Sequence, residues 1–99
     1  MAAPTLRETR EKRAIEVVSV SFEFADVLVT GSTLTGSATV TAQIGLTVVV
    51  SAPSPVGSVV TTQISGGVAG EDYWLKCRCA ASNGDTHELE VVILVRDDN

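Results

Sequence analysis

The chain has 99 residues and a net charge of −5, which leaves room for one domain with a modest core. The acidic balance argues against general binding to nucleic acid, and the length excludes a second lobe around an enzymatic cleft. Valine (16 residues), threonine (11) and isoleucine (4) make 31 of the 99 residues β-branched, and such side chains fit a pleated sheet. Composition therefore predicts an all-β protein.

Charge is distributed unevenly between the first 13 residues and the rest. Four basic side chains stand at Arg7, Arg10, Lys12 and Arg13. With two glutamates this segment has a balance of +2, whereas the remaining 86 residues hold 3 basic and 10 acidic groups, a balance of −7. We predict a basic, extended N-terminal arm over residues 1–13 that lies on the acidic body of another copy, and a domain over residues 14–99. The alternative is a solvated N-terminus.

Alternation of apolar and polar residues predicts a series of short strands. They cover residues 15–24, 37–43, 46–51, 56–65, 73–81 and 86–96. A further apolar stretch over residues 26–34 ends in a turn, and a loop with two prolines occupies residues 52–55. About seven short strands, frequent turns and no helical period are typical of an immunoglobulin-like antiparallel β-sandwich.

The last two predicted strands form the clearest hairpin of the chain. A three-residue loop over residues 82–84, with Gly84 in the left-handed region, would pair Cys79 with His87. This register keeps the apolar faces of both strands on one side of the sheet, where a two-residue turn would separate them.

Cys77 and Cys79 place two sulfur atoms on one face of the predicted strand, opposite His87. Three soft ligands could converge there, but structural zinc usually has four, and a disulfide between such near neighbours would be strained. We therefore predict two buried, reduced thiols.

A hydrolytic triad and a calcium site are the other chemical alternatives. Ser82, Asp85 and His87 have the residue types of a triad, but they lie at a hairpin tip with no elbow to supply an oxyanion hole. Residues 71–72, with Asp26 or the terminal aspartates, could bind calcium, although their spacing matches no EF-hand. We predict no enzyme, no cofactor and no metal site.

Trp74 is the most informative single residue. Its neighbours Tyr73 and Leu75 belong to the predicted core face, so alternation directs Trp74 outward. An aromatic ring flanked by cationic stems is typical of the centre of a protein–protein interface, whereas the other interpretation is a ring that the chain's own loops cover. The predicted interface consists of Trp74, Lys76 and Arg78 with the four basic residues of the arm.

Neither a secretion signal nor a membrane span is expected. The first residues carry acidic side chains and lack an apolar run of the length of a signal sequence, and the longest unbroken apolar run is Val91 to Val95. Two cysteines do not make the disulfide framework of a small secreted domain. We therefore expect synthesis in a reducing cytoplasm.

Three short stretches carry a family resemblance: residues 45–48 (GLTV), 62–73 (TQISGGVAGEDY) and 83–86 (NGDT). Together with the final apolar strand, this pattern over residues 31–96 resembles small tailed-bacteriophage proteins described as fiber-tail adaptor or head-tail connector components.

The resemblance implies a non-enzymatic structural component of a bacteriophage particle. Its expected partners are other copies of itself and portal, tail, fiber or capsid proteins, with no nucleic acid, membrane or small-molecule substrate. The expected location is the virion, after synthesis in the bacterial host cytoplasm. The alternative is an immunoglobulin-like module that binds carbohydrate or protein at a cell surface.

Overall fold

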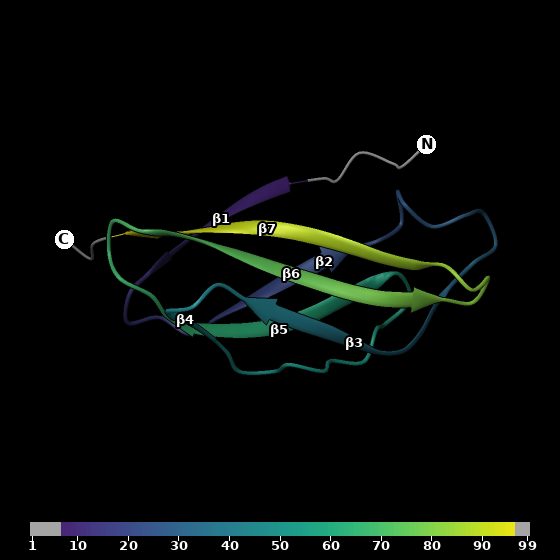
Figure 1. The fold of residues 1–99 in the computed structure, drawn as a ribbon, viewed down its shortest axis with the longest axis horizontal. Helices are drawn as coiled ribbons and strands as arrows, with labels where there is room; N and C mark the ends of the chain where they lie inside the picture. Colours follow the sequence, from purple (N-terminus) through teal and green to yellow (C-terminus); the bar gives the residue numbers. More distant parts are fainter. Residues whose placement is uncertain (1–6, 97–99) are drawn as a thin grey trace.

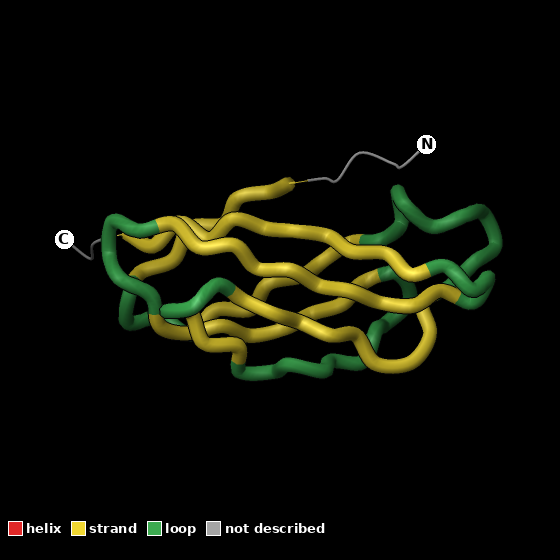
Figure 2. Tube along the Cα trace, in the orientation of Figure 1, coloured by secondary structure: helices red, strands yellow, loops and turns green. Residues whose placement is uncertain are grey.

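A computed structural model describes residues 7–96, and within this range the chain forms strands and no helix (Figures 1 and 2). The strands are β1 (Arg7–Arg13), β2 (Val18–Glu23), β3 (Leu34–Ala42), β4 (Leu46–Val48), β5 (Val59–Gly66), β6 (Asp72–Ala81) and β7 (Thr86–Arg96). The all-β prediction is confirmed. None of the described residues belongs to a helix long and apolar enough to cross a membrane.

Two sheets face each other across one core (Figure 1). One has four strands in the order β1-β7-β6-β3, and the other has three in the order β2-β5-β4. β1 runs parallel to β7, whereas the other four pairings are antiparallel. Consecutive strands therefore often lie in different sheets, and the loops between them gather at the two ends of the molecule.

The core is built by alternation along the strands. On β6 the odd-numbered residues are buried and the even-numbered ones are exposed or half-buried. Burial also alternates on β7, where odd-numbered residues are buried, and on β2, where even-numbered residues are buried. Phe22 and Ile64 from one sheet meet Leu75 and Ile93 from the other, and all four are essentially inaccessible to solvent. Burying a side chain of this size contributes about 1.5–3 kcal/mol, so these contacts hold the sheets together.

The predicted hairpin is confirmed in detail. Cys79 lies opposite His87, and the backbone N–H of Ala81 donates to the carbonyl of Asp85 at 2.7 Å. Three residues therefore form the loop, and Gly84 has a φ of 95°. A residue without a Cβ adopts this angle without strain, which explains why glycine occupies the position.

Several predicted strand boundaries differ from the structure. β3 begins at Leu34 and β5 at Val59, where the sequence predicts residues 37 and 56. The strand expected from residue 15 begins only at Val18, because the chain first reverses from β1, and the N–H of Glu16 donates to the carbonyl of Arg13. The strand expected to reach residue 51 ends at Val48, because the following segment crosses to the other sheet. There the carbonyls of Ser51 and Pro53 accept hydrogen bonds from β3.

The N-terminal segment differs most from the expectation. The prediction separates residues 1–13 from the domain, whereas the structure pairs Arg7–Arg13 with β7 as the edge strand of the four-stranded sheet. Parallel backbone pairing requires no apolar side chains, so a charged sequence can form this strand. Residues 1–6 lie outside the described part of the chain, and contact of the segment with another copy stays a prediction.

Candidate protein–protein interface

Trp74 lies on the outer face of the four-stranded sheet, half-buried, with its neighbours Tyr73 and Leu75 in the core. The ammonium of Lys76, two residues along the same face, lies 4.9 Å from the centre of the indole ring. This distance is typical of a cation–π contact, which holds the ring against the stem of the lysine. The predicted direction of Trp74 is confirmed, whereas its role in an interface stays a prediction.

Gln43 fixes the backbone beneath the ring from the adjacent loop. The N–H of Trp74 donates to Oε1 of Gln43 at 3.2 Å, and the N–H of Gln43 donates to the carbonyl of Trp74 at 3.0 Å. Beside the ring is a hollow of about 200 Å³, lined by Gln43, Asp72, Tyr73, Trp74, Glu90 and Val92. The hollow is large enough for one inserted side chain and has an aromatic wall.

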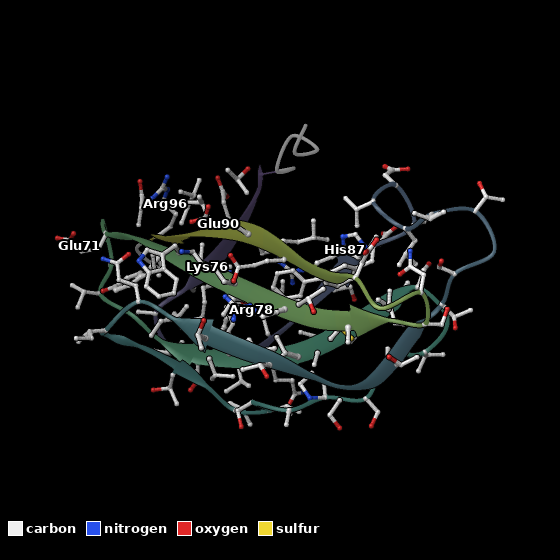
Figure 3. The ribbon with its side chains drawn as sticks, turned by 45° about the vertical axis from the view of Figure 1, so that its right-hand side comes forward. Glu71, Lys76, Arg78, His87, Glu90 and Arg96 are labelled. Carbon is white, nitrogen blue, oxygen red and sulfur yellow. The ribbon has the colours of Figure 1, made fainter. Side chains whose placement is uncertain are left out.

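Arg78 continues the same face of β6 and is exposed (Figure 3). Its guanidinium pairs with the carboxylate of Glu88 on β7 at 3.2 Å, and Lys76 faces Glu90 in the register of the two strands. Figure 3 shows Lys76 and Arg78 on β6 and Glu90 on the neighbouring strand β7. An exposed ion pair such as Arg78–Glu88 contributes little to stability.

Lys12 differs from the prediction for the basic segment. Its side chain is only 2% exposed, and its ammonium donates to the carbonyls of Arg13 and Gly66 at 2.7 Å and of Ala14 at 3.4 Å. Burial lowers the pKa of Lys12 from its usual 10.5, and the nearby carboxylate of Glu16 opposes this shift. Lys12 therefore fastens β1 to the end of β5 in its own domain instead of facing a partner.

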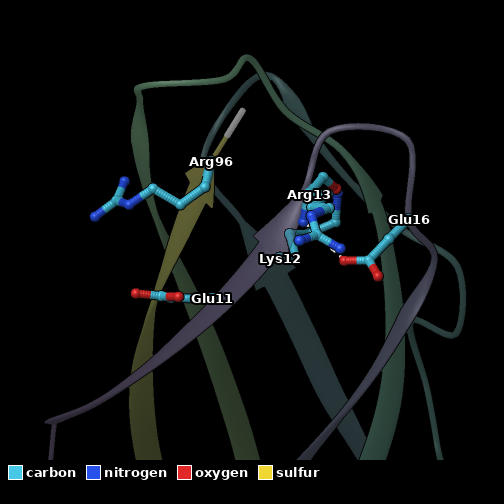
Figure 4. A pocket seen from close by; sticks show the side chains of 5 residues that line it. All are labelled: Glu11, Lys12, Arg13, Glu16 and Arg96. Carbon is cyan, nitrogen blue, oxygen red and sulfur yellow. Dashed lines mark hydrogen bonds between the residues drawn. The ribbon is translucent and has the colours of Figure 1, made fainter. Parts of the chain in front are cut away.

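The other basic residues of the segment lie on β1, which β7 separates from β6, the strand of Trp74. Arg10 and Arg13 are exposed, whereas the side chain of Arg7 lies outside the described part of the structure. A cavity of about 240 Å³ near the end of β1 is lined by Glu11, Lys12, Arg13, Glu16 and Arg96 (Figure 4). Figure 4 shows Arg13 near Glu16, whose carboxylate accepts the backbone N–H of Arg13 at 2.8 Å.

The two thiols are free and buried, as predicted. Burial raises the pKa of Cys77 to about 12, with smaller contributions from Cys79 and Glu88. Burial also raises the pKa of Cys79, whose sulfur lies 3.7 Å from the carbonyl of Thr35. Both groups are therefore protonated and unreactive at neutral pH.

Among the described residues, Ser82 and Asp85 of the candidate triad bind partners other than His87. The hydroxyl of Ser82 accepts the N–H of Thr33 at 3.0 Å, and Asp85 binds Asn83 within the hairpin loop. Nε2 of His87 is buried without a hydrogen-bond partner. Within residues 7–96, no group of three or more His, Cys, Asp or Glu residues could hold a metal ion, and the terminal aspartates lie outside this range.

The residues that carry the family resemblance have structural roles. The N–H of Gly67 donates to the carbonyl of Gly45 at 3.1 Å, which joins the glycine-rich turn to the start of the GLTV stretch. The hydroxyl of Tyr73 accepts the N–H of Val68 at 2.9 Å. A Cβ at Gly45 or Gly67 would lie 2.8 or 2.7 Å from the nearest side-chain atom, so close packing requires glycine at both positions.

One surface signal was missed in the sequence predictions. Residues 27–70 contain no Asp, Glu, Lys, Arg or His. This run forms β3, β4 and β5, and it includes most of the exposed large apolar side chains. Interface cores are depleted of charge, so a count of charges along the chain could have identified this side of the molecule as a second candidate surface.

Comparison with known proteins identifies one family. A family model described as "Podophage GP4 fiber-tail adaptor protein gp77" matches residues 12–94. No curated protein matches the chain, and no solved structure does. The matched range covers the end of β1, β2 to β6 and most of β7, and it includes all three stretches on which the resemblance rests.

Proposed function

The chain belongs to the podophage GP4 fiber-tail adaptor family, and on this premise we propose that it joins virion proteins through the outer face of its four-stranded sheet. As a phage adaptor it is a structural protein of the virion. We propose further that it is made in the host cytoplasm, acts without catalysis or a cofactor, and binds other copies of itself as well as tail or fiber proteins.

We also propose an immunoglobulin-like topology for the domain. In that fold, strands A, B, E and D form one sheet and C, F and G the other. The order β2-β5-β4 corresponds to the first sheet, and β3, β6 and β7 correspond to the second. The first strand, β1, lies in the second sheet beside β7, and at this one strand the chain departs from that order.

Trp74 is the observation that carries the proposed interface. Its ring is held in place by Lys76 and by the backbone contacts of Gln43, yet it remains partly open to solvent beside the hollow. A pre-positioned aromatic side chain loses little conformational freedom on binding, which is why tryptophan is enriched at the energetic centres of interfaces.

We propose that the surface that meets Trp74 is acidic, because Lys76 and Arg78 could exchange Glu90 and Glu88 of their own sheet for carboxylates of a partner. Lys76 and Arg78 follow Trp74 along the same face of β6. On the edge strand β1, Arg13 lies in register with Arg96 on this outer face, whereas Arg10 lies in register with the core residue Ile93 and therefore belongs to the opposite face. Outside its first 13 residues the chain has a balance of −7, so another copy presents such a surface. Complementary charges would orient this contact and accelerate its formation.

The test is Trp74→Ala in the phage that encodes the chain. Truncation of a central interface tryptophan commonly costs about 2 kcal/mol or more, which is about a 30-fold loss of affinity. We expect a folded protein with a normal circular dichroism spectrum that is depleted from purified particles, and a similar but weaker effect of Arg78→Glu.

Thr61→Ala is the matched control, because Thr61 is exposed on the outer face of the other sheet. Incorporation of Trp74→Ala at the wild-type level would refute the interface. An unfolded Trp74→Ala protein would show that the ring supports the fold of its own chain instead.

A further inference from the structure

The four edge strands of the two sheets are protected to very different degrees. An exposed edge offers unpaired backbone N–H and C=O groups to any extended chain, so proteins protect edges with charges, prolines, short strands or covering segments. β1 carries charged residues at six of its seven positions, and β4 is only three residues long. β3 is covered by the segment with Ser51 and Pro53, whose carbonyls bind its N–H groups.

β2 has none of these protections. Within residues 7–96 it pairs with β5 alone, and it contains no proline, no lysine and no bulge. Its single charged residue is Glu23, at the last position. Among the described residues, none pairs with the outer edge of β2 along the whole strand.

The hydrogen-bond pattern specifies which groups β2 offers. The N–H of Phe24 donates to the carbonyl of Ser58, so the even-numbered residues of β2 direct their backbone groups toward β5. In an antiparallel pair the alternate residues point the other way. Ser19, Ser21 and Glu23 thus direct their N–H and C=O groups away from the sheet, and all three are exposed.

We propose that β2 pairs antiparallel with β2 of a second copy, about a two-fold axis at Ser21. This contact uses a different surface from the Trp74 face and does not depend on it. The pairing places Ser21 opposite Ser21 of the second copy, and Ser19 opposite its Glu23. Each of these residues gains both backbone hydrogen bonds, about six in total, and the two three-stranded sheets become one continuous sheet.

The distribution of charge favours a second copy of this chain as the partner of the β2 edge. Each chain has a net charge of −5, so two copies repel each other. This repulsion is smallest where the surfaces that meet carry no charged side chains. β4 and β5, which complete this sheet, lie in the uncharged run of residues 27–70. The proposed register brings no like charges together, because Glu23 faces a serine. Self-complementary contact about a two-fold axis is the commonest arrangement of protein dimers.

Sedimentation equilibrium of the purified chain over a concentration series tests the proposal. The wild type should fit a monomer–dimer equilibrium. Ser21→Glu, which opposes two carboxylates at the axis, should weaken dimerisation about tenfold or more. The matched control is Thr61→Glu: Thr61 faces Ser21 across β5 and bonds to its hydroxyl at 3.0 Å, but it lies on a central strand.

A second pair of variants tests the register. Ser19→Lys would face Glu23 of the second copy and should strengthen the dimer, whereas Gln63→Lys makes the same change of charge one strand inward and should not. A wild type that stays monomeric would overturn the proposal. Equal effects of the two glutamate variants, or of the two lysine variants, would also overturn it, because edge pairing predicts a difference within each pair.

Discussion

The glycine-rich turn between β5 and β6 provides a quantitative test of the packing at this end of the molecule. Gly67 and Gly70 both have left-handed backbone angles, with φ of +94° and +91°. A Cβ at Gly67 would lie 2.7 Å from Cγ2 of Val95 and 3.3 Å from Cε1 of Tyr73, whereas nothing lies within 4 Å of one at Gly70. Substitution by alanine therefore imposes backbone strain at both positions and a steric clash at only one.

The two alanine variants separate these effects. A left-handed angle costs a residue other than glycine about 1–2 kcal/mol, and overpacking adds about 1–3 kcal/mol. We expect Gly70→Ala to lower the free energy of unfolding by about 1 kcal/mol and Gly67→Ala by about 2–4 kcal/mol. In a domain of this size each kcal/mol lowers Tm by about 4–8 °C.

Urea denaturation followed by circular dichroism measures both variants. The difference between them is the informative quantity, because it cancels the backbone strain and the change in the unfolded chain. Val95 is fully buried, so it cannot move aside cheaply. Equal destabilisation of the two variants would refute the close packing of Gly67 against the core.

Three further predictions concern two buried polar side chains, Cys77 and Lys12. Since burial raises the pKa of Cys77 to about 12, only about one thiol in 10⁴ is ionised at pH 8, and labelling by a thiol reagent should be slow until denaturant is added; rapid labelling in native buffer would contradict this. Lys12→Met should destabilise the domain by about 1–3 kcal/mol, measured by urea denaturation, because it leaves the carbonyl of Gly66 without its donor, whereas Lys76→Met should have little effect. Burial lowers the pKa of Lys12, so the unfolded chain keeps this proton to a higher pH than the folded chain. The free energy of unfolding of the wild type should therefore increase as the pH rises from the folded-state pKa of Lys12 to 10.5. A Lys12→Met protein should lack this increase.

The C-terminal hairpin could be predicted from sequence because its signals are local. Alternation over β6 and β7 assigns the buried face, and only a three-residue loop keeps both apolar faces together. The outward direction of Trp74 follows from the same alternation. These predictions needed no knowledge of the rest of the fold.

β1 could not be predicted in the same way. Its sequence has no apolar alternation, and it becomes a strand only because the open edge of β7 supplies backbone partners. The burial of Lys12 has the same origin, since its acceptors include a carbonyl 54 residues away in the chain. The end of β4 likewise depends on long-range contacts, because Val40 on β3 binds the carbonyl of Ser51.

Cryo-electron microscopy of the tail of the phage that encodes this chain tests the adaptor proposal most directly. The account predicts density for the chain between tail and fiber proteins, with the Trp74 face of the four-stranded sheet covered by an acidic surface of a neighbouring protein or of another copy. A reconstruction in which the chain is present but Trp74, Lys76 and Arg78 all face solvent would contradict the account.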